Sequence, residues 1–279
     1  MSKKEIEELT TLIKALDIRY RNEEITREEY DNLMAKYQSK LDEEISIAKS
    51  KSMLKDLSYI SISGSGKVTD SYIKISGSGR VDGWRGGSIS ISGSGKISDD
   101  EIKVSGSASL PGNLETHTLI ASGSIKADGP IETTISTISG SCKIEGYLIA
   151  HEKLTISGSG KIEADIKGGH VLSSGSLIVA GAILCVRAEL NGSYKIGRNV
   201  ECQELFSSEL DSKCSIEGDL LCSGDVQIEK SGRRGHLQVE QILAEGDVYL
   251  EGVSAQYVSG KTVELGPDCQ ISKVEEKGS

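Results

Sequence analysis

The stretch Ile60-Ser61-Ile62-Ser63-Gly64-Ser65-Gly66-Lys67-Val68 decides the fold, because the chain repeats it in degenerate form almost to its C-terminus. The first glycine of this repeat returns at intervals of 13 to 18 residues, at Gly64, Gly77, Gly93, Gly106, Gly123, Gly140, Gly158, Gly175 and Gly192. A repeat of this length is one supersecondary unit. The sequence therefore predicts an array of stacked units rather than a closed globule.

Each repeat has the pattern of a short strand followed by a corner. Ile60 and Ile62 alternate with serines, which is the period of a strand with one buried face. The Ser-Gly-Ser-Gly that follows has no bulky side chain and can turn tightly, so Val68 begins a new strand. Since the chain travels the same way each time round, we expect equivalent strands to pair in parallel. The expected fold is mainly β, a right-handed parallel β-helix (β-solenoid) of about 12 or 13 coils.

The composition fits a narrow core and an acidic, soluble chain. Aromatic residues make up only 4 % of the sequence, so Ile, Val, Leu and Ala have to fill the core. A formal net charge of −10 argues against a nucleic-acid partner. No apolar run approaches the ~20 residues of a membrane-spanning helix, and the charged segment Met1 to Thr11 lacks the apolar region of a signal peptide. We expect a cytoplasmic protein, with peripheral membrane association left open.

The six cysteines form no C-x-x-C pair and stand where the repeat elsewhere carries small or apolar residues; they are Cys142, Cys185, Cys202, Cys214, Cys222 and Cys269. This placement predicts buried thiols rather than a metal site. The four histidines follow no H-x-x-H or H-E-x-x-H spacing, and no phosphate-binding G-x-x-x-x-G-K-[ST] loop is present. We therefore expect no metal, no cofactor and no catalytic residues.

Residues 1–49 carry a different pattern. An apolar seam with spacings of three and four residues predicts an amphipathic helix; it consists of Ile6, Leu9, Ile13, Leu16 and Tyr20. A capping box, Thr26 with Glu29, begins a second such helix. We expect an antiparallel helical hairpin that either caps the solenoid or self-associates. A linker at residues 50–58, the repeat domain at 59–273 and a tail at 274–279 complete the expected organisation.

Stacked coils place equivalent residues in ladders about 4.8 Å apart. A serine ladder is predicted through Ser63, Ser76, Ser92, Ser105, Ser122, Ser139, Ser157 and Ser174, with Asn191 in the same phase. A basic ladder is predicted through Lys67, Arg80, Lys96, Lys126, Lys143, Lys161 and Lys195. Acids two residues further on, such as Asp128 and Glu145, predict an interleaved salt-bridge face. The alternative is a basic stripe for an anionic polymer or membrane head groups.

One strand interrupts the basic ladder with an apolar residue. Both of its faces are apolar, which predicts an exposed lateral patch made of Leu177, Ile178, Val179 and Ile183.

The aligned Ile-x-Ile-Ser-Gly-Ser-Gly-Lys-Val/Ile units, roughly Tyr59 to Ile271, resemble those of the bactofilins, the polymer-forming cytoskeletal proteins of bacteria. The resemblance implies a β-helix of triangular section that joins end to end into nucleotide-independent filaments, often at the membrane. Such filaments serve cell shape or the placement of motility and envelope machinery. The segment Glu24 to Tyr30 resembles the helical SHOCT-type modules of bacterial and archaeal proteins, which implies oligomerisation.

The physics of a solenoid supports self-assembly independently of that resemblance. Each end exposes unpaired backbone groups around an open apolar core, which is a template for another end. The expected interface is formed by the first and last coils, at Tyr59, Ile60, Ile62, Val263, Leu265 and Ile271. We expect a non-enzymatic homopolymer, with a paralogous chain or an envelope protein left open as further partners. The alternatives are a non-polymerising scaffold that binds another protein and, less favoured, a polysaccharide-active enzyme.

Overall fold

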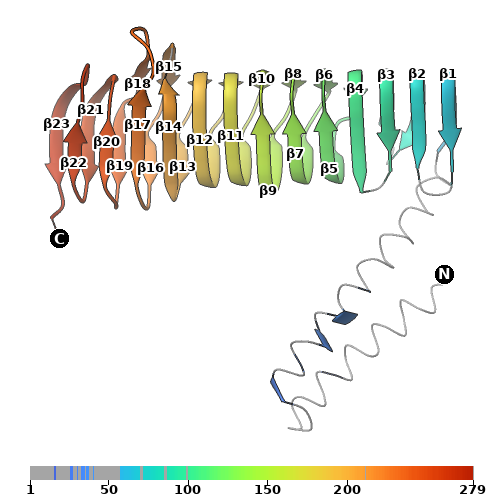
Figure 1. The fold of residues 1–279 in the computed structure, drawn as a ribbon, viewed down its shortest axis with the longest axis horizontal. Helices are drawn as coiled ribbons and strands as arrows, with labels where there is room; N and C mark the ends of the chain where they lie inside the picture. Colours follow the sequence, from blue (N-terminus) through green and yellow to red (C-terminus); the bar gives the residue numbers. More distant parts are fainter. Residues whose placement is uncertain are drawn as a thin grey trace.

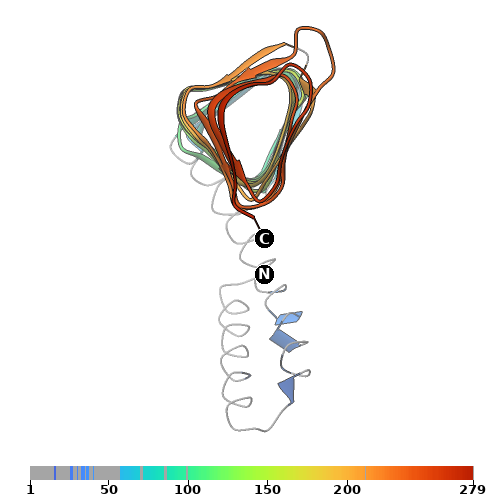
Figure 2. The same cartoon turned by 90° about the vertical axis from the view of Figure 1, so that its left-hand side faces the viewer.

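The computed structural model describes residues 57–69, 72–84, 87–98, 100–210 and 212–278, together with positions 16, 26, 27, 30, 33, 34, 36, 37 and 40. Within these ranges the chain forms 23 strands in one continuous sheet, which winds into a β-solenoid of about ten turns. Figure 1 shows the strands side by side along the rod, and Figure 2 shows a triangular outline along its axis. The predicted mainly β solenoid is confirmed. Apart from those nine positions, residues 1–49 lie outside the described residues, so the predicted hairpin stays a prediction, as does the right hand of the coil.

The first four strands pair antiparallel, contrary to the prediction that all repeats stack in parallel. They are β1 (Tyr59–Val68), β2 (Ile73–Trp84), β3 (Gly87–Ile97) and β4 (Glu101–Leu110). Each repeat glycine still meets the next, since Gly64 pairs with Gly77, and Gly93 pairs with both Gly77 and Gly106. The prediction of about 12 or 13 coils was wrong because it counted these hairpin strands as coils.

Connection length explains the change of direction. Only residues 69–72, 85–86 and 98–100 join the first four strands. A chain needs a crossover of a dozen or more residues to return and begin a parallel strand, so these short connections can only make hairpins. The interval between repeat glycines also separates antiparallel hairpins from full coils. Glycines 13 or 16 residues apart belong to hairpins, whereas those 17 or 18 apart belong to full coils.

The motif tolerates antiparallel pairing because it is nearly symmetric about its first glycine. In β1, Ile60 and Val68 lie four residues to either side of Gly64, and Ile62 and Gly66 lie two residues to either side. Pairing about this centre sets Ile60 opposite Val81 and Val68 opposite Ile73. The apolar face is therefore kept on one side of the sheet although the strand direction is reversed.

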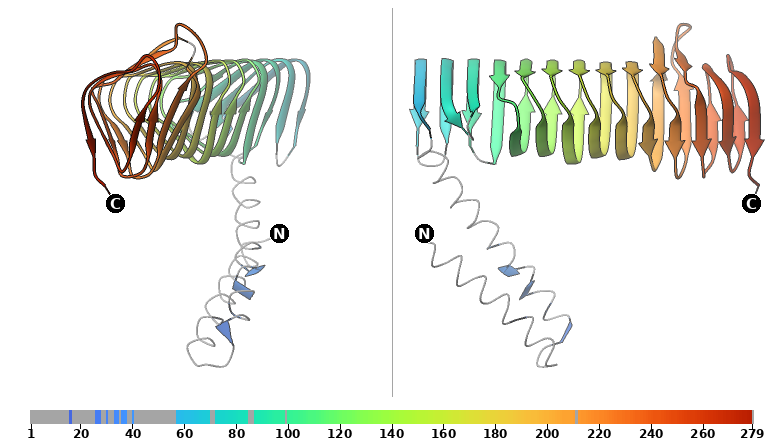
Figure 3. Two further views of the ribbon diagram at one scale, coloured as in Figure 1. Left: turned by 60° about the vertical axis from the view of Figure 1, so that its left-hand side comes forward. Right: turned by 180° about the vertical axis from the view of Figure 1, so that it is seen from behind.

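From β4 onward the strands pair in parallel. The first coils contain β5 (Leu114–Ala121), β6 (Ser124–Ala127), β7 (Ile131–Ile138), β8 (Ser141–Ile144), β9 (Leu148–Ile156), β10 (Ser159–Ile162), β11 (Ile166–Val179) and β12 (Ile183–Ile196). The later coils contain β13 (Val200–Cys202), β14 (Glu204–Leu210), β15 (Lys213–Ile216), β16 (Leu220–Cys222), β17 (Val226–Lys230), β18 (His236–Gln238), β19 (Gln241–Ala244), β20 (Val248–Leu250), β21 (Val253–Gly260), β22 (Val263–Leu265) and β23 (Gln270–Glu276). Figure 3 shows this order from behind, with the blue first strand and the red last strand at opposite ends of the rod.

The glycine corner is confirmed, and no other residue fits it. Gly93 has φ of +119°, and a Cβ built there would lie 2.5 Å from the carbonyl oxygen of Ser105 on the next strand. Residues with a side chain rarely adopt such a φ, and the distance from the built Cβ to this oxygen is shorter than the contacts that real Cβ atoms make. One corner of the rod therefore depends on glycine lying against glycine.

The core is a thin aliphatic column inside the triangle, as the composition predicts. Fully buried residues from strands along the rod include Ile75, Ile102, Leu119, Ile138 and Leu154. Trp84 is completely buried near the N-terminal end. Because each coil contributes only a few such side chains, its core residues are covered from water only when a neighbouring coil packs on each side.

We expect Gly93→Ala to lower the melting temperature by about 5 °C or more, because alanine combines a strained φ with a clash against the next strand. The matched control is Ser92→Ala, at the exposed neighbouring position, which should change the melting temperature by about 1 °C or less. Thermal unfolding followed by circular dichroism compares the two. Equal melting temperatures would show that the corner does not require glycine.

Candidate interaction surfaces

The N-terminal end of the rod presents an open strand edge. Within the described ranges β1 pairs with β2 on one side and with no strand on the other. Tyr59 and Val68 are 56 % and 49 % exposed, and Ile60 and Ile62 are only partly buried against the end of the core. In contrast, Ile75 in β2 is fully buried. The described part of this end therefore combines unpaired backbone with incompletely covered core residues.

The C-terminal end has the same character. Strands β22 and β23 pair with β20 and β21, and no described strand follows them. Val263 and Ile271 are partly buried against the core, whereas Leu265 and Val274 are 42 % and 41 % exposed. The six residues expected at an interface thus lie at the two ends of the rod. Their role in assembly stays a prediction.

The basic ladder exists in the parallel half of the rod, where acids neutralise it. Lys126, Lys143 and Lys161 lie in register on successive coils, and Lys195 follows after Ile178. The Nζ atoms lie 2.7 to 2.9 Å from carboxylate oxygens of Asp128, Glu145, Glu163 and Glu217, respectively. These contacts give the interleaved salt-bridge face that the sequence predicts.

The shifts in pKa agree with this pairing. The hydrogen bond with Asp128 raises the pKa of Lys126, and that with Lys143 lowers the pKa of Glu145. Both groups are exposed to solvent, where such pairs add little to stability. This column is therefore a solvated surface without a surplus of positive charge.

In the antiparallel half, the predicted ladder of Lys67, Arg80 and Lys96 does not form. Reversal of β2 places Arg80 opposite Ser61 and Ser90, and the Arg80 Nε atom lies 2.8 Å from Asp82. A different set of cations comes into register instead: Lys67, Lys74, Lys96 and Lys103. We call these four residues the lysine row. Lys74 and Lys103 were missed because their positions match only when the repeats are read in opposite directions.

Antiparallel pairing also changes which serines of the predicted ladder lie opposite one another. In the antiparallel half Ser63 pairs with Ser78 rather than with Ser76. One unbroken serine row crosses nine strands and consists of Ser63, Ser78, Ser92, Ser107, Ser124, Ser141, Ser159, Ser176 and Ser193. A second row on the other side of the glycine corner begins with Ser65, Ser76, Ser94 and Ser105.

The predicted lateral patch is wrong. Leu177, Val179 and Ile183 are buried in the core, and only Ile178 is exposed, at 43 %. Strand alternation explains the result, since residues 177 and 179 point inward and residue 178 takes the outward place of a lysine in the basic column. One exposed apolar side chain does not make a patch.

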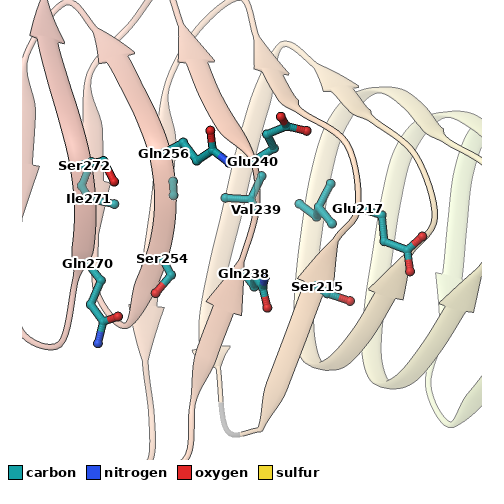
Figure 4. Close-up of a pocket in the computed structure, with 12 residues that line it drawn as sticks. Ser215, Glu217, Gln238, Val239, Glu240, Ser254, Gln256, Gln270, Ile271 and Ser272 are labelled. Carbon is teal, nitrogen blue, oxygen red and sulfur yellow. The ribbon is translucent and has the colours of Figure 1, made fainter.

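A groove of about 910 Å³ lies on the outer surface of the C-terminal coils (Figure 4). Ser215, Gln238, Ser254 and Gln270 form a polar row along it, in continuation of the basic column. Two carboxylates, from Glu217 and Glu240, also line it. The Lys195 Nζ atom lies 2.9 Å from a carboxylate oxygen of Glu217, so one of the two carboxylates is held in an ion pair.

Four of the six thiols are buried as predicted, whereas Cys185 and Cys269 are only partly buried, and no disulfide joins any of the six cysteines. Burial raises the pKa of Cys142 to about 11 and that of Cys185 to about 12, so both stay protonated at neutral pH. Nowhere in the described ranges do three or more histidine, cysteine or carboxylate side chains gather as a metal site requires. The part of the chain that the structure describes contains no helix with the length and hydropathy of a membrane span.

Comparison of the chain with protein families, with curated proteins and with solved structures finds no match. The surfaces described above are therefore the basis for any functional assignment.

We expect Ile178→Gln to change the free energy of unfolding by less than about 0.5 kcal/mol, because its side chain already faces water. Val179→Gln should cost about 2 kcal/mol or more, since it places an amide in the apolar core. Denaturant unfolding of both variants measures the difference. Equal losses would contradict the assignment of residue 178 to the outer face.

Proposed function

We propose that this protein is a non-enzymatic, polymer-forming scaffold whose rods join end to end without a nucleotide. The observation that carries the proposal is that β1 and β23, the first and last described strands, each leave an edge open beside incompletely covered core residues. Exposed strand edges pair readily with other strands, and solenoids that stay monomeric usually cover their ends.

The resemblance of the repeats to bactofilins supports the same assignment and extends it. On that basis the filament is cytoplasmic, associates with the membrane or an envelope partner, and supports cell shape or the placement of motility and envelope machinery. Residues 1–49, as a SHOCT-like hairpin, add a further self-association element or a cap.

The antiparallel strands suggest how two N-terminal ends meet. The structure contains the same pairing three times, between β1 and β2, β2 and β3, and β3 and β4, each time centred on the repeat glycine. The open edge of β1 carries the same motif. A second copy, related by a twofold axis at Gly64, would repeat this register with Ile62 opposite Gly66 of the partner.

If β1 edges pair with each other, each C-terminal end is left to pair with another C-terminal end. The filament then alternates two kinds of twofold contact and has no polarity. Val263, Leu265 and Ile271 would lie in the second contact, where the last coil leaves them partly uncovered. This arrangement distinguishes the proposal from head-to-tail stacking of coils, in which each contact joins two different ends.

The test is to add a lysine at each end separately and together. We expect wild-type protein to form filaments, Ile62→Lys and Ile271→Lys each to stop at dimers, and the double variant to be monomeric. Ser63→Lys and Ser272→Lys are matched controls, because they add the same charge one residue away on the exposed face; both should still polymerise. Size-exclusion chromatography with light scattering, together with negative-stain images, gives the particle size.

A monomeric wild-type protein would contradict the polymer and favour a scaffold that binds another protein instead. Monomers from either single variant would show that both contacts use two different ends, which contradicts the twofold arrangement. Circular dichroism has to show an intact solenoid in every variant for the comparison to count.

A further inference from the structure

Antiparallel pairing brings four lysines into one line on the outer face of the N-terminal strands. Lys67 lies directly opposite Lys74, Lys74 opposite Lys96, and Lys96 opposite Lys103. Neighbouring strands are about 4.8 Å apart, so the lysine row extends roughly 15 Å along the rod. Strands β1 to β4, which carry it, are the blue to green strands at one end of the rod in Figure 1.

Like charges placed directly opposite one another destabilise a sheet. Elsewhere the rod avoids this cost, because each lysine of the basic column has a carboxylate within 2.9 Å. Within the described residues, Lys96 is the one member of the lysine row with an ion pair, at 2.7 Å from Glu101. The Lys67 Nζ atom lies 6.0 Å from the centre of the Tyr72 ring, and Lys74 and Lys103 make no ion pair with any described residue. Among the residues that the structure describes, the row therefore keeps a surplus of positive charge.

A row of hydroxyls runs beside these lysines. Ser65 lies opposite Ser76, Ser76 opposite Ser94, and Ser94 opposite Ser105. Each serine is two residues from a lysine of the row on the same strand and therefore faces the same side of the sheet. Phosphate oxygens accept hydrogen bonds from both hydroxyl and ammonium groups. The serines and lysines together therefore offer the donors that a phosphate group needs.

We propose that the lysine row, with the serines beside it, binds a linear polyanion that carries closely spaced phosphate groups and lies along the rod. The regular spacing of the cations along one line matches a chain of charges. A broad anionic surface such as a membrane would also approach the carboxylates of Asp100 and Glu101, at the end of the row. The protein's net charge of −10 would repel such a surface as a whole. A narrow chain that follows the row lies against the lysines and the hydroxyls, and it meets the Glu101 carboxylate only where Lys96 already neutralises it.

Binding does not depend on the proposed filament, because the lysines lie on the outer face and end-to-end pairing uses the strand edge and the core. The two proposals can therefore fail separately. Light scattering on each variant reports assembly, and titration with the polyanion reports binding.

The experiment uses the full chain and inorganic polyphosphate as the probe, with binding measured by calorimetry at 50 and 200 mM salt. Replacing Lys67, Lys74, Lys96 and Lys103 with glutamine should weaken binding roughly tenfold or more and flatten its salt dependence. The matched control replaces Lys126, Lys143, Lys161 and Lys195 with glutamine, which removes the same number of charges from the neutralised column. We expect this control to change the dissociation constant by about twofold or less.

Equal losses in the two variants would overturn the proposal, since they would reflect net charge rather than a site. Absence of wild-type binding at 50 mM salt would also overturn it. Vesicles with half of their lipid anionic provide the remaining arm, and tighter binding to these vesicles than to polyphosphate would replace the polyanion by a membrane surface.

Discussion

The structure depends on the contact of glycine with glycine at one corner of the triangle. At Gly123 an added Cβ would lie 2.1 Å from the carbonyl oxygen of Gly106, and at Gly140 it would lie 2.2 Å from that of Gly123. No side chain can enter this column, so the coils that contain Gly106 to Gly192 approach one another at strand spacing because the repeat provides glycine there. The flanking serines face outward and the isoleucines face inward as a consequence of that corner.

The same corner allows both strand directions, and this limits what the sequence can predict. The solenoid, the corner, the aliphatic core and the neutralised basic column follow from alternation and repeat phase, as Ile62, Gly64 and Lys126 illustrate. The direction of pairing does not, because a motif that is symmetric about glycine buries the same residues either way. Only connection length separates the two, and the interval between Gly64 and Gly77 is too short for a coil.

The errors at the candidate sites follow from that single ambiguity or from alternation. Reading β2 in the wrong direction assigned Arg80 to a ladder and left Lys74 and Lys103 without a role. Assigning both apolar faces of one strand to a surface patch included Leu177 and Val179, although both point inward and are buried. The ends were predicted more securely, since the first and last repeats of any open solenoid leave their core incompletely covered.

The direction of β2 also connects the two proposals, because it brings the lysine row into register and shows the antiparallel pairing that two β1 edges would repeat. Cysteine cross-linking measures this direction directly. In the antiparallel register residues 63 and 78 are opposite each other, within the Cα separation that a disulfide spans, whereas residues 63 and 76 are offset beyond it. Under mild oxidation we predict a disulfide in the Ser63→Cys/Ser78→Cys variant and none in Ser63→Cys/Ser76→Cys, as mapped by mass spectrometry. The reverse result would show that the repeats stack in parallel from the first strand and would contradict this account.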